Sequence, residues 1–390
     1  MMASDWMIKN QARLSEYARM SRTAGSRPDY VQGGGGNTSC KLDDRLMAIK
    51  ASGFRLDQVR EDQAYAVLDY QALRSFYSHA DPAGYADIEK EGSSRAGAAI
   101  QKIDGLPQLR PSVETGFHSL LDIYVLHTHP VYANLVTCCS EGREVAAAAL
   151  AGLLAETGET MAFVPYINPG TQLTFAVDRA RREAAAANGS GRLPRILFMQ
   201  NHGLIITADD VDTCLDLQDR VNDALAAAFG LSRQDWPAVI LEAGPVNLPD
   251  GVSGHHAATI CWVSKTGWLR DQLLHASWDL DLFTRQALYP DQLVFLAGQM
   301  GAVETGSLDD ALKTGWLPAD KCTIFRQTGE VYYACGANEA RTIEETLCAI
   351  LFITGAIGRK GLKVCTMSEA GQQFITGWES ESYRKTVGAR

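Results

Sequence analysis

Strand-like and helix-like segments alternate over the first 243 residues, and this alternation limits the fold class more than any other feature. The strand-like segments are short and apolar, whereas the segments between them have helical periodicity. We expect strands at 45–51, 122–129, 161–167 and 195–208, and helices at 4–21, 61–79, 143–157 and 209–230. Asp209 or Asp210 could cap the last helix. Residues 80–106 are small and polar, and we expect an excursion or a mobile lid there.

The pattern changes at residues 243–256, AGPVNLPDGVSGHH, which are rich in glycine, proline and small polar residues. Such a stretch is typical of a linker. A chain of 390 residues also has the length of about two domains. We therefore expect one α/β domain over 1–243 and a smaller α+β domain over 257–390, with helices near 268–288 and 338–357.

Charge and composition limit the kinds of partner that this protein can bind. The formal net charge of −10 argues against nucleic acid and against anionic membranes as partners. No apolar run reaches the length of a membrane span, and the first residues lack an apolar signal core. The nine cysteines form no CxxC pair, which favours free buried thiols. We expect a cytoplasmic protein that acts on a small molecule.

Three histidines occur close to a carboxylate in VETGFHSLLDIYVLHTHP, residues 113–130. His127 and His129 are two apart on an expected strand, so both side chains point to the same side. Two imidazoles in this arrangement form half of a metal site, and His202 in QNHGLII is the candidate third ligand. An HxH pair alone is a weak signal that also fits a core or surface pair. We interpret His118 as a packing or supporting residue.

Glu114 allows three interpretations. On a solvated helix it would have no role in a site. Beside a metal it could be a fourth ligand, or a base that substrate displaces from the metal. A carboxylate in such a pocket can have its pKa tuned for proton transfer.

A glycine loop, GGGGNTS at 33–39, could be merely flexible or could bind an anion. It has neither the GxGxxG spacing of a dinucleotide site nor the GK[ST] of a P-loop. Its glycine amides, with Asn37, Thr38 and Ser39, could form a nest for a phosphate. The turn KASG at 50–53 could converge with it, bringing Ser52 and Gly53.

Together, GGGGNTS, IKASG, SVETGFH, HTHP and NHGLI, in this order, resemble the class II aldolase/adducin family over roughly residues 8–235. The resemblance implies an α/β/α sandwich around a mixed, mostly antiparallel sheet, and a homotetramer. It implies metal ligands at His127, His129 and His202, with zinc as the expected ion and manganese, cobalt or nickel as substitutes. It also implies a role for Glu114 as the acid/base. Phosphate positions fall on Asn37, Ser52, Gly53 and Ser112, whereas Val113 replaces a second serine of some members.

The resemblance implies a metal-dependent aldolase similar to the fuculose-phosphate and rhamnulose-phosphate enzymes. Such an enzyme cleaves a ketose phosphate to dihydroxyacetone phosphate and an aldehyde through a metal-stabilised enediolate. The alternatives are a decarboxylase of a 3-oxo sugar-acid phosphate, a sugar-phosphate 4-epimerase and a non-catalytic, adducin-like interaction protein. A hydrated metal site has no use in a scaffold, which argues against the last.

The C-terminal extension, 257–390, carries no nucleotide motif and no set of histidines and cysteines with ligand spacing. His255, His256 and His275 lie near its start without a matching carboxylate pattern. We expect a packing and oligomerisation module, or alternatively a cover over an active site with YPDQ, 289–292, as the contact.

Overall fold

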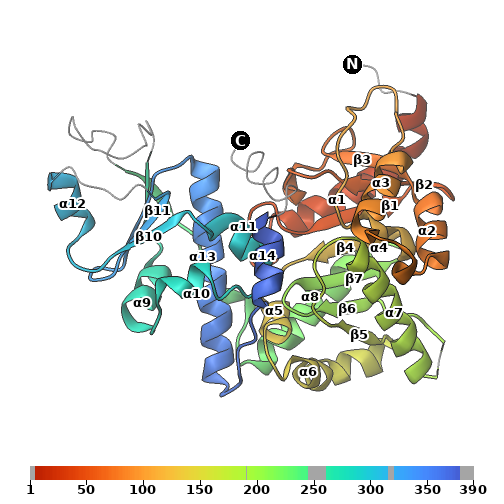
Figure 1. Ribbon diagram of the computed structural model, residues 1–390. Coiled ribbons are helices and arrows are strands. Elements are labelled where there is room, and N and C mark those ends of the chain that lie inside the picture. The colour runs from red at the N-terminus through yellow and green to blue at the C-terminus, as the bar shows by residue number, and fades with distance from the viewer. Residues whose placement is uncertain (1–4, 190, 245–260, 315–319, 378–390) are drawn as a thin grey trace. The chain divides into compact units, whose positions relative to one another are not determined.

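The computed structural model describes residues 5–189, 191–244, 261–314 and 320–377 (Figure 1). The chain forms two compact units, Met1–Gly230 and Leu231–Arg390. The second unit begins before the expected boundary at 243 because β8 (Leu241–Ala243) pairs with β9 (Trp262–Ser264) in the sheet of that unit. Most of the expected linker, including His255 and His256, lies outside the described residues.

A seven-stranded sheet, in the order β3-β2-β1-β4-β7-β6-β5, forms the centre of the first unit. Every neighbouring pair is antiparallel except β5 and β6, which are parallel. The strands are β1 (Asn37–Lys41), β2 (Leu46–Lys50), β3 (Tyr65–Asp69), β4 (Tyr124–Thr128), β5 (Met161–Val164), β6 (Ile196–Met199) and β7 (Gly203–Ala208). This is the mixed, mostly antiparallel sheet that the family resemblance implied.

Helices pack against both faces of this sheet (Figure 1). One layer contains α1 (Asp5–Gly25), α5 (Val131–Thr137), α6 (Gly142–Thr157) and α8 (Val211–Ala228). The other contains α2 (Tyr70–His79), α3 (Ile88–Ala99), α4 (Thr115–Leu120) and α7 (Thr171–Ala187). The expected α/β/α sandwich is confirmed.

The second layer buries two apolar clusters against the sheet. One joins α4 and α7 to strands β4 to β7, and includes Phe117, Val125, Leu173 and Ile205. The other joins α2 and α3 to β2 and β3. Burial of a large apolar side chain stabilises a fold by about 1.5–3 kcal/mol, so these contacts fix α4, the helix that follows Glu114, against the sheet.

Several boundaries differ from those expected. Within 61–79, residues 65–69 form strand β3, whose first four residues are buried, and α2 begins at Tyr70. The segment 195–208 forms two antiparallel strands, β6 and β7, joined by a tight turn rather than one strand. Within the glycine loop expected at 33–39, strand β1 already begins at Asn37.

The expected excursion or lid at 80–106 is also wrong, because α3 is part of the helical layer. Glu89 of α3 accepts hydrogen bonds from the backbone amides of Thr171 at 2.7 Å and Gln172 at 2.8 Å. These amides belong to the first turn of α7, where a carboxylate is favourable. Gly92 allows the close approach, since a Cβ there would lie 1.9 Å from Oγ1 of Thr171.

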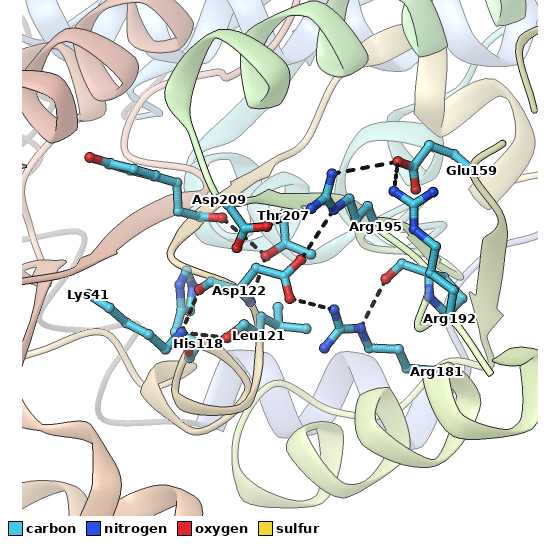
Figure 2. Close-up of polar contacts among 12 residues, drawn as sticks. Lys41, His118, Leu121, Asp122, Glu159, Arg181, Arg192, Arg195, Thr207 and Asp209 are labelled. Carbon is cyan, nitrogen blue, oxygen red and sulfur yellow. Dashed lines mark hydrogen bonds and ion pairs between the residues drawn. The ribbon is translucent and has the colours of Figure 1, made fainter. Parts of the chain in front are cut away.

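A buried lysine ties α4 to the sheet (Figure 2). Nζ of Lys41 donates to the carbonyl oxygens of His118 (3.2 Å), Leu121 (2.5 Å) and Asp122 (2.5 Å), near the end of α4. Burial, with the charge of Arg74 nearby, lowers the pKa of Lys41 to about 7. Asp122 in turn pairs with Arg181 at 2.9 Å. The network therefore fixes the end of α4 and Asp122, which leads into β4.

In the described part of the second unit, five strands form a sheet in the order β10-β11-β12-β9-β8; β10 and β11 are parallel, and the other neighbouring pairs are antiparallel. Its other strands are β10 (Met300–Val303), β11 (Cys322–Phe325) and β12 (Glu330–Tyr333). Its helices are α9 (Gly267–His275), α10 (Leu280–Thr284), α11 (Pro290–Leu296), α12 (Leu308–Thr314), α13 (Ala337–Arg359) and α14 (Glu369–Gly377). The unit is therefore α+β, as expected.

Two buried polar side chains, Glu344 and Gln292, hold helices of the second unit in place. The carboxylate of Glu344 on α13 accepts from Ser264 (3.0 Å) and Tyr333 (2.7 Å), which joins this helix to β9 and β12. Gln292, in the YPDQ segment, donates to the carbonyl oxygens of Leu282 (2.8 Å) and Phe283 (3.2 Å). The Gln292 amide thus holds α11 to α10 within this unit.

Among the described residues, none of the helices has the length and apolar character needed to cross a membrane.

We predict that the N-cap of α8 depends on Asp210 and not on Asp209. Asp210 accepts from the amide of Thr213 at 2.7 Å, whereas Asp209 pairs with Arg195 and its side chain is 63% exposed. Asp210→Ala should lower the free energy of unfolding by about 1 kcal/mol, as loss of a helix cap does. The control Asp209→Ala loses only an exposed ion pair, worth about 0–1 kcal/mol. Urea unfolding measures both, and a larger loss for Asp209→Ala would contradict the assignment.

Candidate metal centre

Strand β4 and the turn before β7 bring the three predicted ligands together. His127 and His129 project to one side of the strand end, while the intervening Thr128 accepts a hydrogen bond from Gln218 of α8 at 2.8 Å on the other side. His202 lies in the turn between β6 and β7, closed by a hydrogen bond from its amide to the carbonyl of Met199 at 3.1 Å. Because β7 pairs with β4, this turn ends beside the two histidines.

The three imidazoles form a buried cluster that could hold a metal ion. One ring nitrogen from each of His127, His129 and His202 lies within 4.8 Å of the others. The Nε2 atoms of His127 and His129 are 3.1 Å apart, close to the separation of two nitrogens bound to one metal at about 2.0–2.1 Å. Nδ1 of His127 donates to the carbonyl of Leu204 at 3.0 Å, which directs its Nε2 into the cluster.

Glu114 completes this cluster from the residue before α4. Its Oε1 is 3.2 Å from Nε2 of His202, and its Oε2 is 3.4 Å from Nε2 of His127. Oε2 also accepts a hydrogen bond from Nδ2 of Asn37 at 2.6 Å. The side chain of Glu114 is only 6% exposed. A carboxylate and three imidazoles therefore face one buried point, a donor set that suits zinc and related divalent ions.

Opposing effects act on the Glu114 carboxyl. Burial alone would raise its pKa, but the charges of His127 and His202 and the hydrogen bond from Asn37 outweigh burial and lower the pKa to about 2. For His118, burial is the largest effect and, with His127 nearby, holds the pKa well below its usual value. Glu114 is therefore ionised, whereas the His118 ring is neutral.

The residues expected to bind phosphate, except for Thr38, lie next to Glu114 and are linked by hydrogen bonds. Asn37 donates to Oγ of Ser112 at 3.1 Å. Ser52 donates through Oγ to the carbonyl of Pro111 at 2.9 Å, so the turn with Gly53 lies beside the segment that ends at Ser112. Gly53 has a φ of 85°, which glycine adopts without strain.

Thr38 is the exception, and the expectation that it lines the site needs correction. Successive side chains on a strand alternate between faces, and the structure places Thr38 on the face of β1 opposite to Asn37. Its Oγ1 lies 2.7 Å from Oγ of Ser21 on α1, and the residue is fully buried. Thr38 therefore joins the strand to α1 and does not face the histidine cluster.

Two contacts of the site were not expected from the sequence. The Leu204 carbonyl orients His127, but a backbone group leaves no sequence signal. Ser39 was expected in an anion nest, yet its Oγ lies 2.7 Å from Nδ1 of His118. The spacing of Asn37 and Ser39, two apart on a strand, could have indicated that both face the same neighbour.

The chain belongs to the class II aldolase and adducin family, since the family model described as Class II Aldolase and Adducin N-terminal domain matches residues 15–229. The match spans more than half of the 390 residues. The second unit lies beyond it, as the sequence predicted for a C-terminal extension. No curated protein matches the chain.

Three solved structures match this chain over most of their own length but differ strongly from it in sequence. The N-terminal class II aldolase domain of a conserved Thermoplasma acidophilum protein is 20% identical, with 58% of this chain and 93% of that chain covered and a TM-score of 0.44. An L-fuculose 1-phosphate aldolase is 18% identical, with 64% and 93% covered and a TM-score of 0.35. A Thermotoga maritima sugar-phosphate aldolase is 15% identical, with 56% and 94% covered and a TM-score of 0.40.

We predict that the loop needs a glycine at position 36 but not at position 34. Gly36 has a φ of 67°, and a Cβ there would lie 2.6 Å from the carbonyl oxygen of His127. Gly36→Ala should therefore lower the free energy of unfolding by more than the roughly 1–2 kcal/mol of a left-handed alanine. The matched control Gly34→Ala meets no atom within 4 Å. Urea unfolding of metal-free protein measures both, and equal stabilities would contradict the role of Gly36.

Proposed function

We propose that the protein is a metal-dependent carbon–carbon lyase that cleaves a ketose phosphate to dihydroxyacetone phosphate and an aldehyde. Family membership supports the reaction class, because the family's name includes the class II aldolases. The observation that carries the proposal is the position of Glu114, whose two carboxylate oxygens lie 3.2 and 3.4 Å from Nε2 of His202 and His127. A proton-transfer group thus sits beside a candidate metal.

His127, His129 and His202 would hold the ion, with zinc as the expected metal and manganese, cobalt or nickel as substitutes. When bound, a divalent ion supplies Lewis-acid stabilisation of the negative charge that develops on a substrate carbonyl oxygen. The burial of all three histidines limits access of water to this point.

Glu114 would move the proton at the carbon next to the carbonyl. In the synthetic direction, a carboxylate oxygen takes a proton from this carbon of dihydroxyacetone phosphate, and the electron pair of the broken C–H bond is left for attack on the aldehyde. In cleavage, the same oxygen returns the proton to the three-carbon fragment. Asn37 holds this carboxylate in place through its 2.6 Å hydrogen bond.

A phosphate would bind beside Glu114, at the turn that contains Ser52 and Gly53. Ser112 and Asn37 lie at the same place, since Asn37 donates to both Ser112 and Glu114. We further propose a cytoplasmic homotetramer in which residues 257–390 pack and assemble the subunits. The resemblance of the sequence to the fuculose-phosphate and rhamnulose-phosphate aldolases supports this part.

A panel of ketose phosphates and 3-oxo acid phosphates, incubated with enzyme and zinc and analysed by mass, tests the reaction class. Dihydroxyacetone phosphate together with an aldehyde identifies an aldolase. Carbon dioxide identifies a decarboxylase, and an isomer of unchanged mass, resolved by chromatography, identifies an epimerase. Either of the last two results would replace the proposed reaction. A simpler assay follows deuterium exchange into dihydroxyacetone phosphate in D2O by NMR, because this step needs no aldehyde.

The metal ligands give one prediction. His202→Ala removes one of three donors and should abolish stoichiometric zinc binding while circular dichroism stays unchanged. The control is His275→Ala, which changes an exposed histidine at the end of α9. Zinc content is measured by mass spectrometry after dialysis. Zinc bound equally well by both variants would contradict the site.

The acid/base role of Glu114 gives another. Glu114→Gln keeps the side-chain size and removes the base, so deuterium exchange should slow by about 10²–10⁴-fold. The three histidines should still bind zinc. The control Glu156→Gln changes an exposed residue on α6, and should exchange at the wild-type rate. If Glu114→Gln also exchanged at that rate, Glu114 would have only a structural role.

A further inference from the structure

His118 is a buried histidine of the first unit that stays outside the metal cluster. It is fully buried, and both of its ring nitrogens have partners. Nδ1 lies 2.7 Å from Oγ of Ser39, and Nε2 contacts Oδ1 of Asn37. The ring also stacks on Phe117, with centroids 4.7 Å apart. A side chain held on three sides has one orientation, so it can orient its partners.

The chemistry of the donors and acceptors fixes the direction of the hydrogen bonds. The Glu114 carboxylate only accepts, so Asn37 must direct its NH2 group at Glu114. The Asn37 carbonyl oxygen then faces Nε2 of His118, which must carry a proton to donate. In a neutral ring, Nδ1 holds the lone pair and accepts from the Ser39 hydroxyl. The sequence of donors runs from Ser39 through His118 and Asn37 to Glu114.

The fold explains why one ring can reach both partners. Asn37 and Ser39 are two apart on β1 and face the same side. His118 follows Glu114 by four residues, about one helical turn along α4. Lys41 and the apolar contacts of Phe117 fix α4 against the sheet. The His118 ring therefore spans two strand residues while Glu114 stays at the start of the same helix.

We propose that His118 is a positioning residue that orients the Asn37 amide and, through it, holds the Glu114 carboxylate in place beside His127 and His202. Without His118, the Asn37 amide can rotate and turn its carbonyl oxygen toward the carboxylate, which repels it. Glu114 would then lose the hydrogen bond from Asn37, and its distance to the histidines would no longer be fixed. The catalytic consequence rests on the proposed function, whereas the effect on geometry does not.

Two variants of His118 separate positioning from packing. His118→Gln retains an NH2 group that can donate to Asn37, whereas His118→Leu fills the space without a donor. We would make both in the wild-type and in an Asn37→Ala background, with circular dichroism to check folding. If His118→Leu does not fold, Ser39→Ala, which removes only the donor to Nδ1, takes its place.

The first readout is the visible absorption spectrum of the Co2+-substituted protein, which needs no substrate. His118→Gln should match the wild type, and His118→Leu should shift toward the spectrum of Glu114→Gln. In the Asn37→Ala background, His118→Leu should cause no further change. An unchanged spectrum for His118→Leu, or effects of the two substitutions that add, would overturn the proposal.

The second readout is the rate of deuterium exchange into dihydroxyacetone phosphate. His118→Leu should lower its kcat by about 10–100-fold, as loss of a residue that orients a metal site does, with a smaller change in KM. His118→Gln should restore most of the rate. Absence of exchange in the wild type would contradict the proposed function alone, because the cobalt spectrum still decides the role of His118.

A third readout is independent of both metal and activity. Metal-free protein labelled with 15N-histidine should show His118 protonated at Nε2 in long-range proton–nitrogen correlations, assigned by its loss in His118→Gln. Protonation at Nδ1 would reverse the direction of the hydrogen bonds and overturn the proposal.

Discussion

The antiparallel pairing of β4 with β7 is the constraint on which the candidate site depends. In this register Thr128 lies opposite Leu204 and His127 opposite Ile205. The pairing brings the turn with His202 to the end of β4, where His127 and His129 already share one side. It also places the Leu204 carbonyl 3.0 Å from Nδ1 of His127. A shift of one residue would reverse the face of every side chain on β4 and remove both histidines from the site.

This arrangement buries the Glu114 carboxylate, and burying a charge has an electrostatic cost. Removing a carboxylate from water costs several kcal/mol unless charge and hydrogen bonds compensate for it. Asn37 supplies one hydrogen bond, and the remaining compensation has to come from positive charge at the histidine cluster. A divalent cation between the histidines would supply it. The same carboxylate that could move a proton thus gives a physical reason for a metal at this point.

The sequence predicted the parts of the site that a local pattern can encode. Two histidines on one strand must share a side, and the structure places His127 and His129 in this way. The sequence analysis did not predict that Thr38 contacts Ser21 on α1, because it placed the start of β1 within a loop. Nor did it indicate that α3 belongs to the packed layer, since the contact of Glu89 with α7 joins residues 82 positions apart. Long-range pairing of this kind is absent from composition and periodicity.

X-ray absorption of the zinc-loaded protein is the most direct test that the three histidines form a metal centre. The account predicts one zinc per chain, nitrogen and oxygen neighbours at about 2.0–2.1 Å, and the outer-shell scattering of three imidazoles. Sulfur neighbours at about 2.3 Å would assign the metal to cysteine and contradict the account. So would a protein that takes up no zinc at all.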